Sequence, residues 1–209
     1  MIRISVIIPT IKGREEHYRR CVAAYQTRTA GFEAELITEH DHRSAGAGWQ
    51  AGAERATGDF LHFTADDIEP HPGWAAPAVQ ALTEGYVPAP RVVSPSGELQ
   101  YLPEWGRDYP DWTPVHMSVL PMITRALWEG HVRPLFTGHY FCDDWISWRA
   151  AQAGYTCRLR TGYSFTHHWA QHGRGAGMTQ NARLQHDNLL FAQAREMANM
   201  GTWDRPWPP

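Results

Sequence analysis

Short apolar runs alternate with amphipathic stretches through the first half of the chain. The apolar runs are rich in β-branched residues, which indicates buried strands, and they cover residues 2–8, 34–38 and 59–64. The stretches after them indicate helices and cover residues 14–29, 47–56 and 71–82, the last with Pro72 in its first turn. Strands that alternate with helices favour βαβ units with right-handed crossovers. The pattern therefore predicts a mostly parallel α/β sheet flanked by helices.

The second half of the chain predicts shorter and less regular elements. Strands are expected within residues 85–102, on either side of a turn at 94–97, and at 155–160 and 163–168. An apolar run at 115–123 leads into a short helix from Arg125, and longer helices are expected over residues 142–154 and 180–199. Residues 103–114 predict an ordered loop, and the three glycines within 172–178 predict a flexible one. A stretch rich in Trp and Pro follows the last helix.

The composition is that of a globular protein, since 43% of the 209 residues are hydrophobic and 20% are charged. No apolar run reaches the roughly 18 to 20 residues that a membrane span needs, and no signal peptide is recognised. We therefore expect a cytoplasmic protein with no membrane span. With a net charge of −3, the chain as a whole lacks the excess positive charge that binds nucleic acid phosphates. The 3 cysteines lack a CxxC spacing, so neither a disulfide framework nor a thiolate zinc site is expected.

Polar residues follow each of the first three predicted strands. Pro9 and Thr10 follow the first strand, residues 39–41 follow the second, and Asp66 and Asp67 follow the third. In open α/β sheets, ligands bind outside the carboxyl ends of the strands. This edge of the sheet is therefore the candidate site.

The adjacent residues Asp66 and Asp67 pose an electrostatic question, because neighbouring carboxylates repel each other unless a positive charge lies close by. Such a pair suits a solvated turn or a helix cap. It equally suits a divalent cation, because Mg²⁺ and Mn²⁺ prefer carboxylate oxygens together with water and phosphate oxygens.

A second acidic pair, Asp143 and Asp144, begins the predicted helix at residue 142. Either carboxylate suits a helix cap. Beside Trp145 and Trp148, either one also suits a general base that faces a partly dry cleft.

A histidine cluster lies at the end of the last predicted strand, which holds His167 and His168, and continues with His172 after it. Adjacent residues on a strand point to opposite faces, so His167 and His168 are not expected to share one zinc ion. One of them joining a carboxylate-bound cation is the favoured arrangement. The glycines within residues 44–52 miss the dinucleotide-binding spacing, so no nicotinamide or flavin cofactor is expected.

The motifs SVIIPT (5–10), ATGDFLHFTADD (56–67) and CDDW (142–145) occur in an order that resembles the family-2 glycosyltransferases with the GT-A fold. The resemblance extends over about residues 3–170. It implies an α/β GT-A fold and an inverting transfer of a sugar from a nucleotide diphosphate sugar to an acceptor hydroxyl, with Mn²⁺ or Mg²⁺ on the diphosphate. It also implies one catalytic domain over residues 1–170, with residues 171–209 packed on it as a loop, a helix and a tail.

On the donor side, this resemblance places Pro9 and Thr10 near the donor base, within a donor-binding half of about residues 1–95. Asp41 matches the family's acidic pair after the second strand, where His40 replaces the first acid. The expected donor-binding residues are completed by Lys12, Arg14, Gln50, Asp66 and Arg174, the last on a loop that closes over the diphosphate.

The family's Asp-x-Asp motif falls on Ala65, Asp66 and Asp67, so Ala65 departs from the pattern. The resemblance implies that Asp67 and His167 hold the metal and that Asp66 takes over the lost contact of the first acid.

The acceptor and base half is expected at about residues 96–170. Asp143 matches the family's base by its distance from a following arginine, and Asp144 matches by the following tryptophan, so both stay candidates. Aromatic residues are expected on the acceptor or sugar face, namely Trp105, Trp112, Trp145 and Trp148.

Two alternative functions remain open at this stage. Ala65 favours an inactive module that binds a nucleotide sugar without turnover. A sugar-phosphate nucleotidyltransferase of related fold is the other alternative, for which Lys12 alone is a thin match. The acceptor is open among a small molecule, a glycan, a protein and a modified nucleobase, and the sequence specifies no oligomeric state.

Overall fold

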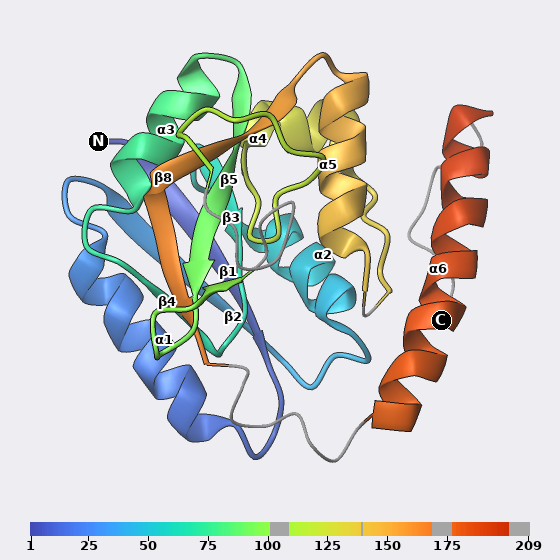
Figure 1. The fold of residues 1–209 in the computed structure, drawn as a ribbon, viewed down its shortest axis with the longest axis horizontal. Helices are drawn as coiled ribbons and strands as arrows, with labels where there is room; N and C mark the ends of the chain where they lie inside the picture. Colours follow the sequence, from blue (N-terminus) through green and yellow to red (C-terminus); the bar gives the residue numbers. More distant parts are fainter. Residues whose placement is uncertain (101–108, 139, 169–176, 201–209) are drawn as a thin grey trace.

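The computed structural model describes residues 1–100, 109–138, 140–168 and 177–200 (Figure 1). Its strands are β1 (Arg3–Thr10), β2 (Glu33–His40), β3 (Phe60–Phe63), β4 (Ile68–Pro70), β5 (Tyr86–Val93), β6 (Leu99–Gln100), β7 (Met122–Thr124) and β8 (Thr156–His167). Its helices are α1 (Glu15–Arg28), α2 (Ala45–Arg55), α3 (Ala75–Thr83), α4 (Arg125–Leu127), the π-helical turn η1 (Trp128–Val132), α5 (Cys142–Gln152) and α6 (Gly177–Asn199). The alternation predicted for the first half is confirmed.

The first sheet has the strand order β2-β1-β3-β7. β1 pairs in parallel with β2 and β3, so that Ile7 lies opposite Ile37 on one side and Phe63 on the other. β7 closes this sheet in the antiparallel direction. The prediction of a mostly parallel sheet is confirmed for these strands.

Both faces of β1 are buried, as expected for a central parallel strand. Ile4, Val6 and Ile8 belong to an apolar cluster with residues of α1 and α3, whereas Ile7 belongs to a second cluster with residues of α2 and α5. Successive side chains of a strand point to opposite faces, so the two clusters are the two sides of one sheet.

Helix α2 packs closely against β1 because two of its glycines lack side chains. A Cβ atom added at Gly48 would lie 2.8 Å from the Pro9 Cβ, and one added at Gly52 would overlap the Ile7 side chain. The glycines within residues 44–52 therefore serve helix packing.

The second sheet has the order β4-β8-β5-β6 and mixes parallel with antiparallel pairing. The expectation of two separate strands at 155–160 and 163–168 is wrong, because β8 runs continuously through both. Its register against β5 shifts between Pro90 and Arg91. A bulge places extra residues in one strand without ending it, so β8 continues through Thr161 and Gly162.

β4 was not predicted. Ile68–Pro70 pair with the end of β8. The helix predicted from residue 71, with Pro72 in its first turn, is wrong at its start, because residues 71–74 form a turn after β4 and α3 begins at Ala75. β4 joins the turn after β3 to the second sheet, and it thereby carries Asp66 and Asp67 to the last residues of β8.

Helix α6 lies at the edge of the molecule beside α5 (Figure 1). It is anchored by Phe191 and Ala194, which are buried in the same cluster as Trp145. Within the described ranges, no helix is both long and apolar enough to cross a membrane. Residues 103–108 of the predicted loop at 103–114, residues 172–176 of the predicted loop at 172–178, and the stretch from residue 201 lie outside the described residues.

Candidate active site

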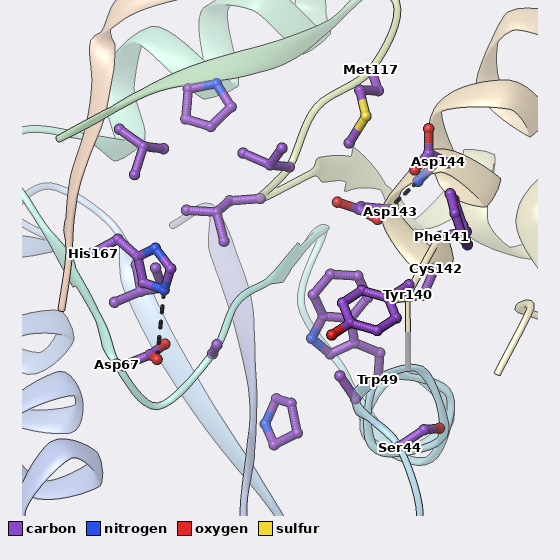
Figure 2. A pocket seen from close by; sticks show the side chains of 18 of the residues that line it. Ser44, Trp49, Asp67, Met117, Tyr140, Phe141, Cys142, Asp143, Asp144 and His167 are labelled. Carbon is purple, nitrogen blue, oxygen red and sulfur yellow. Dashed lines mark hydrogen bonds and ion pairs between the residues drawn. The ribbon is translucent and has the colours of Figure 1, made fainter. Parts of the chain in front are cut away.

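A cavity of about 940 Å³ lies at the carboxyl ends of β1 and β3. Its walls come from the end of β1, the turn after β3, the start of α2, β5, the segment before β7, the start of α5 and the end of β8. Figure 2 shows Asp67 and His167 on one side of this cavity and Asp143 and Asp144 on the other. The predicted convergence of strand ends on one edge therefore produces a cavity that is open to solvent on one side.

The pairing of β4 with β8 brings Asp67 to His167. Ile68 lies opposite His167 in this antiparallel pair, and the backbone N–H of His168 donates to the Asp67 carbonyl at 3.0 Å. The Nε2 atom of His167 consequently lies 3.5 Å from the Asp67 Oδ2 atom. The two residues that the resemblance assigned to the metal are thus neighbours, although 100 positions separate them in the sequence.

The positive charge beside the two aspartates is the guanidinium of Arg14. Its Nη2 atom lies 2.7 Å from Asp66 Oδ1 and 2.7 Å from Asp67 Oδ2. Arg14 immediately precedes α1, while both aspartates follow β3, so the interaction ties the first loop of the chain to the third strand. Both carboxylates are buried, at 4% and 7% exposed, which makes this ion pair less screened than one on the surface.

The two aspartates differ in acidity because their neighbours differ. Burial raises the pKa of Asp66, and the charge of Asp67 adds to this effect against the hydrogen bond from Thr10 at 2.7 Å. Burial opposes ionisation of Asp67 as well, but His167 and Arg14 outweigh it and hold the Asp67 pKa well below its ordinary value. Asp67 therefore stays ionised to a lower pH than Asp66 does.

Asp143 and Asp144 lie in the first turn of α5, which follows Phe141 in the left-handed backbone region at φ 66. Burial, together with the charge of Asp144, raises the pKa of Asp143 to about 7. The Asp144 backbone N–H donates to Asp143 Oδ1 at 3.1 Å. The Asp143 carboxylate extends into the cavity toward the side of His167, and the Asp144 carboxylate lies farther from His167, toward Met117 (Figure 2).

The Asp67 carboxylate and the His167 imidazole are the side chains that suit a divalent cation. A carboxylate oxygen and an imidazole nitrogen 3.5 Å apart form an open pair that one cation can share after a small movement. No cluster of three or more His, Cys, Asp or Glu side chains suited to a metal occurs in the part of the chain that the structure describes. The pair therefore fits a cation whose remaining ligands are phosphate and water oxygens, provided that Arg14 turns away from Asp67 Oδ2.

The structure places the other predicted site residues in three different locations. Pro9, Thr10, Arg14, Asp66 and Ala65 line the cavity. Lys12 and Asp41 line a smaller neighbouring hollow of about 250 Å³, where the Lys12 backbone N–H donates to Asp41 Oδ1 at 3.0 Å. Trp105 and Arg174 lie outside the described residues.

Four other predicted residues are described but do not line the cavity. Gln50 is buried and accepts a hydrogen bond from the Leu135 N–H at 2.7 Å. Trp145 is fully buried and donates to the Val132 carbonyl at 3.1 Å. The remaining two pack under arginine side chains elsewhere on the molecule, namely Trp112 beneath Arg160 and Trp148 beneath Arg195.

Several cavity residues were not singled out from the sequence, namely His42, Ser44, Trp49, His116, Met117, Tyr140 and Phe141. Trp49 had a signal, because it is the aromatic residue of the glycine-rich stretch that packs on β1. Its Nε1 donates to the Thr64 carbonyl at 2.8 Å, at the carboxyl end of β3. The others come from loops, where no periodic pattern marks which residues face a cavity.

Comparison with known proteins identifies the fold. No family model and no curated protein matches the sequence. Among solved structures, the chain is similar to S. aureus TarS, with a TM-score of 0.59 and 13% identity over 80% of this chain and 37% of that one. It is also similar to GalNAc-T7 in a crystal with UDP, GalNAc and Mn²⁺, with a TM-score of 0.62 and 15% identity over 81% of this chain and 44% of that one. The chain thus spans less than half the length of either structure, and the likeness shows a GT-A fold.

Proposed function

We propose that this chain is a metal-assisted glycosyltransferase that moves a sugar from a nucleotide diphosphate sugar to an acceptor hydroxyl with inversion. The observation that carries the proposal is the arrangement of two chemically different ends in one cavity. The cationic and acidic cluster of Arg14, Asp67 and His167 lies at one end, and Asp143 lies at the other. A transfer that needs a stabilised leaving group on one face and a base on the opposite face requires such an arrangement.

Asp143 is the proposed general base. Its carboxylate faces the cavity, and its pKa of about 7 gives it more affinity for a proton than an ordinary aspartate while a large fraction stays ionised near neutral pH. The acceptor hydroxyl would donate its proton to Asp143 as its oxygen attacks the anomeric carbon of the donor sugar. Asp144, which lies farther from His167, would tune the acidity of Asp143 through its charge.

At the opposite end, the leaving diphosphate gains negative charge as the bond to the sugar breaks. Arg14 can exchange its two carboxylate partners for phosphate oxygens, because a guanidinium binds both anions through the same N–H groups. Asp67 and His167 would hold the divalent cation, which supplies Lewis-acid stabilisation of the diphosphate. Asp66, which accepts a hydrogen bond from Thr10, would accept another from a hydroxyl group of the nucleotide sugar.

A screen of nucleotide sugars by thermal shift, with and without Mn²⁺, tests this function. A ligand that binds only the folded state raises the apparent unfolding temperature. We expect one donor to stabilise the protein in a Mn²⁺-dependent manner and to be consumed when an acceptor is added. The absence of stabilisation by every nucleotide sugar would refute the proposal.

The inactive binding module is the second candidate, and Ala65 is the observation that favours it. Ala65 lines the cavity at the position where the resembled family carries an acid. Stabilisation by a donor with neither hydrolysis nor transfer would support this candidate. The raised pKa of Asp143 favours turnover instead, because a binding module has no use for a buried base.

A further inference from the structure

The end of the cavity that carries Asp143 is bordered by large apolar and aromatic side chains. Three chain segments contribute them: the stretch before β7, the loop that enters α5, and helix α6. Met117, Tyr140 and Phe141 lie near the two aspartates, and Val115 and Leu184 line the cavity as well. Leu184 lies one turn before Asp187 on α6, and the Tyr140 N–H donates to Asp187 Oδ2 at 3.0 Å, which places this part of α6 beside the loop that enters α5. Figure 2 shows Met117 beside Asp144, and Phe141 and Tyr140 on the other side of Asp143.

Part of this border is exposed to solvent. Leu184 is 40% exposed, although α6 buries its Phe191 and Ala194 against the core. Phe141 and Met117 are half-buried. Apolar surface left open at the mouth of a cavity gains about 25 cal/mol per Å² when a ligand covers it.

Buried apolar side chains also line the cavity away from this border, namely Val92 of β5, Leu159 of β8 and Leu120. Val92 lies opposite Phe165, two residues before His167, so it belongs to the wall near His167. Among the described residues, the polar side chains that line the cavity outside Thr10, Arg14, Asp66, Asp67 and His167 are His42, Arg43, Ser44, His116, Tyr140 and the two aspartates of α5. His42, Arg43 and Ser44 already hydrogen-bond within the protein, to Glu39 or to Thr137. A polyhydroxylated acceptor would lose water from several hydroxyl groups here, and each one left without a partner costs roughly 1–3 kcal/mol.

We infer that the acceptor carries its hydroxyl on a hydrophobic framework, as in a phenol or a lipophilic alcohol, and that Leu184, Met117 and Phe141 bind that framework. This inference rests on the proposed glycosyl transfer. The hydroxyl would point to Asp143 while the framework covers the apolar border. Leu184 is then a specificity-determining residue contributed by the C-terminal helix.

Acceptor binding is tested first, without any donor. Saturation-transfer NMR of the full chain would use 2-naphthol as the aromatic probe, cyclohexylmethanol as the aliphatic probe and D-glucose as the polyol probe. We expect signals for at least one apolar probe and none for glucose at equal concentration. Leu184→Gln should weaken the apolar probe several-fold, and Leu189→Gln should not, because Leu189 is 67% exposed on the same helix and does not line the cavity.

Turnover is tested second, with a donor identified by thermal shift. We expect Leu184→Gln to raise the KM for the apolar acceptor several-fold and to leave the KM for the donor unchanged. Equal effects of the Leu184 and Leu189 variants, or glucose binding as well as the apolar probes, would overturn the inference. If apolar probes bind at Leu184 but no nucleotide sugar binds, the inference about ligand class stands and the proposed glycosyl transfer fails.

Discussion

At the residue scale, Arg14 lies between the two aspartates at one end of the candidate site. Its guanidinium contacts two buried carboxylates at 2.7 Å each, and Asp67 in turn faces His167 at 3.5 Å. The repulsion between Asp66 and Asp67 is therefore relieved by a residue of the chain itself in this structure. The divalent cation proposed for Asp67 would compete with Arg14 for the same oxygen atom, Asp67 Oδ2.

Replacing Arg14 by methionine should make the protein depend on a metal for stability. Loss of the guanidinium leaves two adjacent buried carboxylates, and because Arg14 is partly exposed we expect a cost of about 1 to 3 kcal/mol in the free energy of unfolding. Mn²⁺ should stabilise Arg14→Met more than the wild type in a thermal-shift measurement. Arg20→Met is the control, because Arg20 on α1 pairs with Glu69 at 3.0 Å and does not line the cavity. An equal Mn²⁺ shift in all three proteins would contradict the competition.

Asparagine variants separate the two candidate bases. Asp143→Asn should lower kcat by roughly 10²- to 10⁴-fold, the usual contribution of a general base, and leave donor binding intact. Asp144→Asn should have a smaller effect, because its carboxylate acts through Asp143. The measurement is kcat with saturating donor, together with the donor thermal shift. Full activity of Asp143→Asn would refute the assignment of the base.

The raised pKa of Asp143 predicts a specific pH dependence. Turnover should rise with pH through about 7, because the base must be ionised. Stability should change in the opposite direction. Between about pH 4, the ordinary aspartate value, and pH 7 the folded state binds the proton more tightly than the unfolded state does, so the free energy of unfolding falls as the pH rises. Asp143→Asn should thus raise the unfolding temperature at pH 8 and leave it nearly unchanged at pH 4.

At the scale of elements, the strands and helices of the first half follow the hydrophobic pattern closely. Burial on both faces of β1 and β3 leaves little freedom for another structure there. The predictions failed where pairing between distant strands decides the outcome, at β4 and in β8. β4 is only 3 residues long and gains its hydrogen bonds from β8, so no local pattern marks it.

The packing of α2 on β1 provides a test at this scale. Gly52→Ala should destabilise the protein by about 1 to 3 kcal/mol, because the added methyl group overlaps the Ile7 side chain in a closely packed core. Gly130→Ala in η1 is the matched control, since a Cβ atom there meets nothing within 4 Å. Urea unfolding of both variants measures the difference. Equal stability of the two variants would show that α2 can move away from β1 without cost.

At the scale of the whole molecule, helix α6 packs on the residue that precedes α5, the helix that carries the candidate base Asp143. Phe191 stacks on Phe141 with ring centroids 5.3 Å apart, and Phe141 immediately precedes α5, which carries Asp143. Leu184 of the same helix borders the cavity. The packing of α6 therefore supports the start of α5, where the candidate base Asp143 lies, and it adds Leu184 to the apolar border of the cavity.

Phe191→Ala should loosen this docking. Loss of a buried phenylalanine ring typically costs about 3 to 5 kcal/mol, and Phe191 also contacts Phe136 and Trp145. Leu189→Ala, at an exposed position of the same helix, should cost little. Chemical unfolding gives the free energies, and limited proteolysis within residues 177–200 reports on the docking itself. Unchanged proteolysis in Phe191→Ala would show that other contacts hold α6.

The sequence by itself determined the alternation of strands and helices, the GT-A class of fold and the edge of the sheet where the site lies. The alternation and the edge follow from local hydrophobic periodicity and from the direction of parallel strands, whereas the GT-A class was implied by the resemblance of three motifs to a known family. Only the tertiary structure decided that Arg14 bridges the two aspartates, that Asp143 rather than Asp144 faces the His167 side, and that Gln50 and Trp145 are buried away from the cavity. Those outcomes depend on strand register and helix docking between segments up to about 100 residues apart, which local sequence patterns do not encode.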